Sequence, residues 1–292
     1  MVAIVLALAS AVSFGGSDYT AGLATRVTSV IRVVLAEQLG SILLVLLVVP
    51  WLSPMRLSAA GAGWGAMAGV TGTAGAMVLY LGFRYAAFSV ASTLSAVGSA
   101  GLSVGAGLLF GERPGALAVA GIVLALPAIA AVSAQGPGDA PEAGTGESGP
   151  GRHLAGVGYG LIAGVCFALY FIGLNRAGSG SGLWPVLVGQ GTSLLVVVCA
   201  GAVRRELKMP ADRKTQVQSV LTGVTGTAGT ILFFVASHDG LLAVTAVITS
   251  LYPAVTIVLA RVLLGERLSR MRLAGLCLAG ASVALIAVAG AG

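Results

Sequence analysis

The sequence is dominated by apolar runs of about twenty residues, separated by short breaks that carry most of its charges and prolines. A helix rises about 1.5 Å per residue, so each run can cross a bilayer core of about 30 Å. The runs lack the apolar–polar alternation that strands of a membrane barrel need. The pattern therefore predicts an all-α integral membrane protein with ten transmembrane helices, over residues 2–22, 31–50, 61–82, 86–109, 115–134, 154–175, 184–203, 217–237, 241–264 and 271–290.

Composition argues against the usual soluble classes. Of the 292 residues, 57% are hydrophobic and 9% are charged, whereas a soluble domain carries about 25% charged residues. We assign the net charge of +6 to loops and lipid headgroups, because no basic stripe is interleaved with aromatic residues. We therefore expect the lipid bilayer, and no nucleic acid, as a partner. The three cysteines and two histidines are scattered, so no metal site and no cofactor are predicted.

The chain repeats itself about its midpoint. The heptapeptide GVTGTAG occurs at 69–75 and at 223–229, and the tripeptide GER occurs at 111–113 and at 265–267. Both matches are 154 positions apart, which indicates an internal duplication. Between the copies lies a stretch rich in glycine, proline and acidic residues, which cannot bury apolar surface and is predicted to be a flexible linker. The predicted domains are repeat 1 (1–134), the linker (135–152) and repeat 2 (153–292).

Each predicted repeat has five spans, an odd number, so the second must begin on the opposite side of the membrane from the first. Two inverted five-helix repeats are typical of transporters that open a site near the midplane to each side in turn. The sequence thus predicts a secondary transporter of a small-molecule substrate. We find no HExxH, GxSxG or P-loop lysine, so an enzyme is not expected. The alternative is a membrane-embedded enzyme or lipid-modifying protein without transport activity.

Several of these motifs resemble a known family. The two GER motifs, the glycine-containing span after each of them, and Ser250-Leu251-Tyr252-Pro253 in the ninth span are similar to the EamA-type branch of the drug/metabolite transporter superfamily. The resemblance covers nearly the whole chain. It implies a ten-helix, inverted-repeat exporter or exchanger of metabolites, amino acids or drugs, with a central cavity, in the cell membrane.

The orientation in the membrane stays open. Most lysines and arginines lie in loops after odd-numbered spans, and the positive-inside rule puts those loops in the cytoplasm and both termini outside. Relatives in the resembled family are usually drawn with both termini inside. Substrate identity, coupling ion, direction of transport and oligomeric state are likewise not fixed by the sequence.

Polar residues within the spans are the candidate site residues, because a charge in the bilayer is costly. Asp18 either couples proton or substrate movement to transport or is solvated or locally paired near the interface. Glu37 is expected to pair with Arg32 near the interface or to snorkel. Gln38 and Gln190 occupy matching places in the two repeats, where they either bind substrate or tie helices together. Other candidate lining residues are Tyr80, Ser95, Tyr170, Ser250 and Tyr252.

Two further features are expected to be structural. Pro253 removes one backbone hydrogen bond in the ninth span and is predicted to kink it. In each GER motif the glycine is expected to end a helix, and the adjacent charges to tie the loop to its neighbours. The loop residues concerned are Glu112, Arg113, Glu266 and Arg267.

Overall fold

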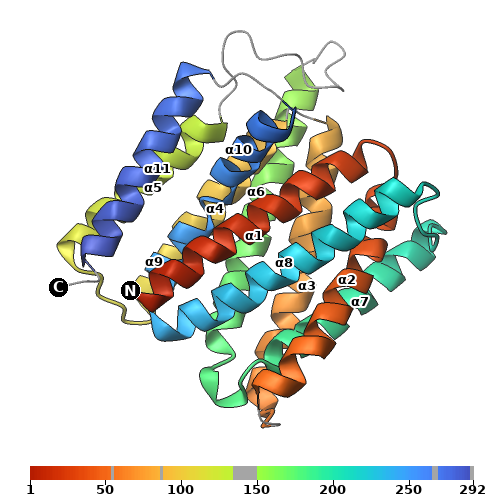
Figure 1. The fold of residues 1–292 in the computed structure, drawn as a ribbon, viewed down its shortest axis with the longest axis horizontal. Helices are drawn as coiled ribbons and strands as arrows, with labels where there is room; N and C mark the ends of the chain where they lie inside the picture. Colours follow the sequence, from red (N-terminus) through yellow and green to blue (C-terminus); the bar gives the residue numbers. More distant parts are fainter. Residues whose placement is uncertain (54–55, 86–87, 134–149, 265–268, 290–292) are drawn as a thin grey trace.

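The computed structural model describes residues 1–53, 56–85, 88–133, 150–264 and 269–289, and every regular element in these ranges is a helix (Figure 1). The elements are α1 (Val2–Thr25), α2 (Val30–Leu52), α3 (Ala59–Tyr85), α4 (Phe88–Leu109), α5 (Ala116–Ser133), α6 (Pro150–Arg176), the 3₁₀ turn η1 (Ser179–Ser181), α7 (Trp184–Arg204), α8 (Arg213–Asp239), α9 (Leu242–Thr249), α10 (Tyr252–Leu264) and α11 (Arg270–Ala289).

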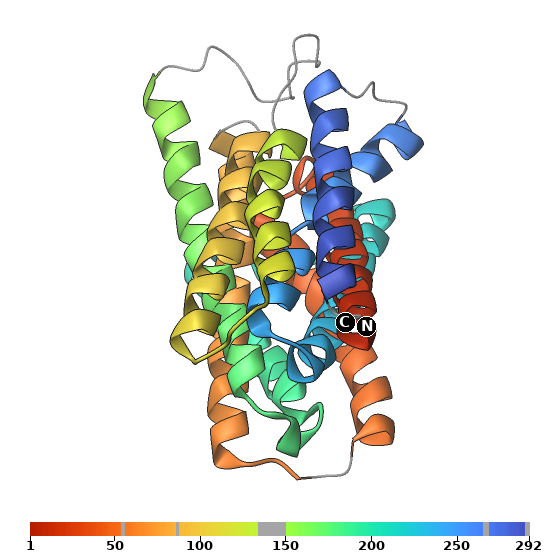
Figure 2. The same cartoon turned by 90° about the vertical axis from the view of Figure 1, so that its left-hand side faces the viewer.

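The helices occupy the places of the predicted spans. Within the described ranges, nine helical stretches are long and apolar enough to cross a membrane when α9 and α10 are taken as one, and α5 is a shorter apolar helix. Figure 2 shows the helices running roughly along one direction, as in a bundle that spans a bilayer. The prediction of an all-α, multi-pass membrane protein is confirmed. Most of the predicted linker lies outside the described residues.

The ninth predicted span is broken rather than continuous. α9 ends at Thr249, Ser250 and Leu251 form a turn, and α10 begins at Tyr252. Pro253 lies in the first turn of α10 and has no N–H to donate to the carbonyl of Thr249, so the backbone cannot continue the helical ladder there. The kink expected at this proline takes the form of a break on its N-terminal side.

Helix ends outside the membrane follow local chemistry. α8 begins after Asp212, whose carboxylate accepts hydrogen bonds from the backbone N–H of Thr215 at 3.0 Å and from its hydroxyl at 3.1 Å. These bonds favour the charged form and keep the pKa of Asp212 below its ordinary value. After α4 the chain passes through Gly111 at a φ of 94°, a left-handed conformation that favours glycine.

The two halves of the chain are interleaved. α1 packs against α8 and α6 against α3, while α2 packs against α8 and α7 against α3. α5 and α11 pack against each other, and the views in both figures agree on this. The helices at matching places in the two halves are α1 and α6, α2 and α7, α3 and α8, and α5 and α11. Exchanging the members of each pair gives the same set of helix contacts. In Figure 1, α1 starts at the lower left and rises, whereas α6 starts near the top and descends.

The GVTGTAG segments of α3 and α8 lie where helices approach most closely. A Cβ on Gly69 would lie 2.1 Å from the carbonyl oxygen of Gly189 in α7, and a Cβ on Gly223 would lie 1.9 Å from that of Glu37 in α2. Both distances are far below van der Waals contact, so only glycine allows these backbones to meet.

The correspondence continues along the same two helices. A Cβ on Gly75 would lie 3.0 Å from the ring of Phe167, and a Cβ on Gly229 would lie 3.0 Å from the ring of Phe14. Phe14 and Phe167 occupy similar places in α1 and α6. Matching glycines of the two halves therefore contact matching aromatic rings of the opposite halves.

The first GER motif joins the halves through Glu112. Its Oε1 accepts the backbone N–H of Leu242 at 2.6 Å and its Oε2 that of Ala243 at 2.9 Å, which caps the N-terminus of α9. Arg113 donates instead to backbone carbonyls, those of Glu112 at 3.0 Å and Leu108 at 3.5 Å. The carboxylate of Glu112 and the guanidinium of Arg113 thus each hold the loop to its neighbours through their own hydrogen bonds. Glu266 and Arg267 lie outside the described residues.

Glu112→Gln is expected to destabilise the protein by about 2 kcal/mol, because the neutral amide has one accepting oxygen for two N–H donors and no charge at the helix end. The measurement is the midpoint of thermal unfolding of the purified protein. Arg113→Gln is the matched control, because the exposed Arg113 side chain donates to carbonyls close to it in sequence, and the change is expected to shift stability by less than about 0.5 kcal/mol. Equal losses for the two variants would contradict the capping role.

Candidate functional site

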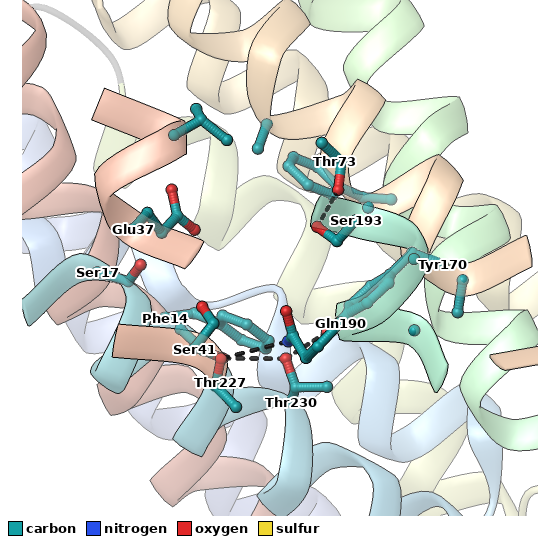
Figure 3. Close-up of a pocket in the computed structure, with 18 of the residues that line it drawn as sticks. Phe14, Ser17, Glu37, Ser41, Thr73, Tyr170, Gln190, Ser193, Thr227 and Thr230 are labelled. Atoms are coloured by element: carbon teal, nitrogen blue, oxygen red, sulfur yellow. Dashed lines mark hydrogen bonds between the residues drawn. The ribbon is translucent and has the colours of Figure 1, made fainter. Parts of the chain in front are cut away.

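A cavity of about 130 Å³ lies between the two halves of the chain. Side chains from α1, α2 and α3 of the first half and from α6, α7, α8 and α10 of the second line it (Figure 3). Three pairs of polar lining residues come from matching positions of the two halves: Gln38 and Gln190, Ser41 and Ser193, Thr73 and Thr227.

The two glutamines reach the cavity without meeting each other. Nε2 of Gln38 donates to the hydroxyl of Ser193 at 3.2 Å, and Nε2 of Gln190 donates to that of Thr227 at 3.2 Å. Ser193 is also hydrogen-bonded to Thr73. Each amide therefore ties two helices together beside the cavity. Oε1 of Gln38 is buried and has no hydrogen-bond partner in the described part of the chain.

One side of the cavity carries two carboxylates. Asp18 of α1 and Glu37 of α2 both line it, and both are half-buried. Oε2 of Glu37 and Nε of Arg32 are each buried, and within the described ranges neither atom has a hydrogen-bond partner, so the ion pair expected from the sequence is not made through these atoms. Glu37 faces the cavity instead. Among the described lining residues there is no lysine or arginine to neutralise the two acids.

The other side of the cavity is aromatic. Phe171 packs against Tyr170 and Phe233, with ring centroids 5.4 Å and 4.5 Å away, and Phe14 lies 6.4 Å from it. The hydroxyl of Tyr170 is hydrogen-bonded to that of Thr230 at 2.5 Å. Phe233 is fully buried and belongs, with Phe171, to a packed apolar layer that bounds the cavity on this side.

Six of the eight predicted lining or coupling residues line this cavity: Asp18, Gln38, Tyr80, Tyr170, Gln190 and Tyr252. The hydroxyl of Tyr252 is buried and lies beside the side chain of Ser95. Ser95 and Ser250 do not line the cavity. Both are fully buried, and Ser250 shares a 3.3 Å hydrogen bond with Ser99 where α9 meets α4.

Glu37 and the small hydroxyl residues of the lining were not predicted as site residues from the sequence. The repeat carried a signal for the hydroxyls, since Ser41 and Ser193 follow the paired glutamines by three residues, and Thr73 and Thr227 lie within the paired heptapeptides. Glu37 had no such counterpart. Across the described part of the chain, no group of three or more histidine, cysteine or acidic residues is arranged to hold a metal ion.

Comparisons with known proteins agree with this fold. Residues 154–288 match the model of the EamA-like transporter family. A solved crystal structure of a protein aligns with 96% of this chain and 98% of its own, at a TM-score of 0.70 and 14% sequence identity. An identity this low shows a shared fold. No curated protein matches the sequence.

Proposed function

We propose, from the premise that this chain belongs to the EamA-type branch of the drug/metabolite transporter superfamily, that it is a secondary transporter working by alternating access around the cavity between its halves. The solute would be a small metabolite, amino acid or drug, moved as an export or exchange reaction across the cell membrane. The family match points to a transporter rather than a membrane-embedded enzyme. Because no ATP-binding motif is found in the sequence, an ion gradient or a second solute would drive uphill movement.

The observation that carries this proposal is the place of the cavity. It lies between the two halves and takes matching polar residues from both, such as Gln38 and Gln190. A transporter of inverted repeats binds its solute at the interface of the repeats, because rocking one against the other then exposes the same site to each side. The exchangeable helix pairings and the opposite courses of α1 and α6 support this arrangement (Figure 1).

The test is a flux screen in proteoliposomes with an imposed pH gradient. Ala76 lines the cavity from α3, and Ala76→Trp is expected to fill it and to reduce solute flux at least about tenfold. Val70 on the same helix is 45% exposed on the outer surface, so Val70→Trp is the matched control and should transport normally. Absence of flux with every class of metabolite, or equal flux through both variants, would overturn the proposal.

A further inference from the structure

We infer that the cavity selects a cationic solute that carries N–H donors, such as a primary ammonium or guanidinium group, on an apolar or aromatic body. The inference rests on the proposed transport function and names the class of solute that this site would accept. Three independent properties of the cavity lead to it: its charge, its unfilled hydrogen-bonding atoms and its aromatic wall.

The charge comes first. Asp18 and Glu37 line the same cavity, from α1 and α2. Placing two acids in a confined site without a positive partner is unfavourable. The described lining supplies no lysine or arginine to relieve the repulsion. A bound cation would relieve it, whereas an anion would add to it.

The unfilled hydrogen-bonding atoms set the chemistry of that cation. Oε2 of Glu37 and Oε1 of Gln38 are buried, and neither has a hydrogen-bond partner among the described residues. Gln38 is only 3% exposed. The hydroxyl of Tyr252 also lines the cavity, beside the side chain of Ser95. A carboxylate oxygen and an amide oxygen can only accept hydrogen bonds, and a tyrosine hydroxyl can accept as well as donate. Buried polar groups are almost always paired, so these atoms fit a ligand rich in N–H donors.

The aromatic wall fits the rest of the solute. Figure 3 shows Glu37 on one side of the cavity, with Tyr170 and Gln190 across from it. Phe171 adds ring surface beside Tyr170, and Phe14, which Figure 3 shows near Ser17 and Ser41, lies 6.4 Å from the ring of Phe171. Rings can hold an apolar or aromatic body by stacking, and their faces also attract positive charge.

The acidic pair belongs to one half only. The positions that match Asp18 and Glu37 in the second half are occupied by Phe171 and Gly189, whereas both amides and four of the lining hydroxyls are paired between the halves: Ser41 with Ser193 and Thr73 with Thr227. The two carboxylates are therefore not part of the architecture that the repeats share, so the fold alone does not explain why they are present. A role in selecting the solute explains their presence.

The inference is tested by binding to the full-length protein in lipid nanodiscs, measured by calorimetry. The probes are phenethylamine, phenylalanine and 3-phenylpropionate, which share a phenyl ring on a short alkyl chain and carry positive, zwitterionic and negative charge. Phenethylamine is expected to bind at least about tenfold more tightly than 3-phenylpropionate, since a charge-assisted hydrogen bond contributes roughly that factor.

The variants identify the groups responsible. Glu37→Gln and Asp18→Asn are each expected to weaken phenethylamine binding about tenfold, while Asp239→Asn, which removes an exposed carboxylate at the end of α8, should leave it unchanged. Tyr252→Phe removes one hydroxyl of the cavity lining and keeps the ring, so it should fold normally and weaken binding severalfold. It keeps the inference testable if an acidic-site variant does not fold.

The outcomes separate this inference from the proposed function. Tighter binding of the anion, or unaltered phenethylamine binding in Glu37→Gln, Asp18→Asn and Tyr252→Phe, would overturn the cationic class. Saturable flux of a zwitterion or anion in proteoliposomes that is unaffected by Glu37→Gln would also overturn the cationic class. It would leave the transporter proposal standing. Absence of flux with every solute would instead overturn the transporter proposal.

Discussion

Gly223→Ala is expected to destabilise the protein by about 3 kcal/mol or more. The new Cβ would lie 1.9 Å from the carbonyl oxygen of Glu37 and 2.9 Å from the backbone nitrogen of Ser41. Both atoms belong to the backbone of α2, which cannot move aside as a flexible side chain can. α2 and α8 would have to separate, and the carboxylate of Glu37 would move with its helix out of the cavity.

The matching position in the first half gives a second test of the same packing. A Cβ on Gly69 would lie 2.1 Å from the carbonyl oxygen of Gly189, so Gly69→Ala should lose a similar amount of stability. Gly63 is the control, because it is in the same helix and a Cβ there meets nothing within 4 Å. Gly63→Ala should be neutral or stabilising by up to about 1 kcal/mol, since alanine is the better helix former. Thermal unfolding in one detergent compares all three, and equal midpoints would refute the close approach.

Asp18→Asn is expected to abolish solute accumulation driven by a pH gradient, with downhill exchange falling less. A carboxylate can hold either a proton or a cationic solute, whereas an amide can carry no proton between the two sides. The titratable groups that face the cavity are Asp18, Glu37, Tyr80, Tyr170 and Tyr252, and only the first two are acids. If a proton and the solute compete for these acids, release of one favours binding of the other. This competition is what an exchange of protons for solute requires.

The assay is accumulation of labelled solute in proteoliposomes with and without the gradient. We expect at least a tenfold fall in gradient-driven uptake for Asp18→Asn, comparable with general effects of removing a proton-transfer group. Asp239→Asn removes an exposed acid outside the cavity and should behave as the unmodified protein. Proton-driven uptake that survives in Asp18→Asn would remove this residue from the coupling mechanism.

Most of the fold was predictable because the hydrophobic effect acts on long stretches of chain. A run of about twenty apolar residues between charged breaks specifies a spanning helix almost regardless of its neighbours. The break in the ninth span was only partly predictable. Pro253 marks where the ladder must fail, but the turn at Ser250 and Leu251 depends on how α9 and α10 pack against α4 and α1.

The site was less predictable because it depends on helix rotation. Glu37 and Gln38 are adjacent, about 100° apart around α2, and both face the cavity because α2 lies between α7 and α8. Nothing in the local sequence sets that rotation, so the nearby Arg32 looked like the natural partner of Glu37. The surroundings of Ser95 and Ser250 were hard to predict for the same reason. Both side chains are fully buried, and Ser250 is hydrogen-bonded to Ser99 of α4.

The confinement of both acids to one half has a consequence for the energy of the cycle. In a carrier with identical halves, the inward-facing and outward-facing conformations would be equivalent and equally populated when empty. Here Phe171 and Asp18 occupy matching positions, so the place that Phe171 takes in one conformation would be taken by Asp18 in the other. Removing water from a carboxylate costs much more free energy than removing it from an apolar ring. The unloaded protein should therefore rest predominantly in one orientation, with unequal apparent affinities measured from the two sides of the membrane.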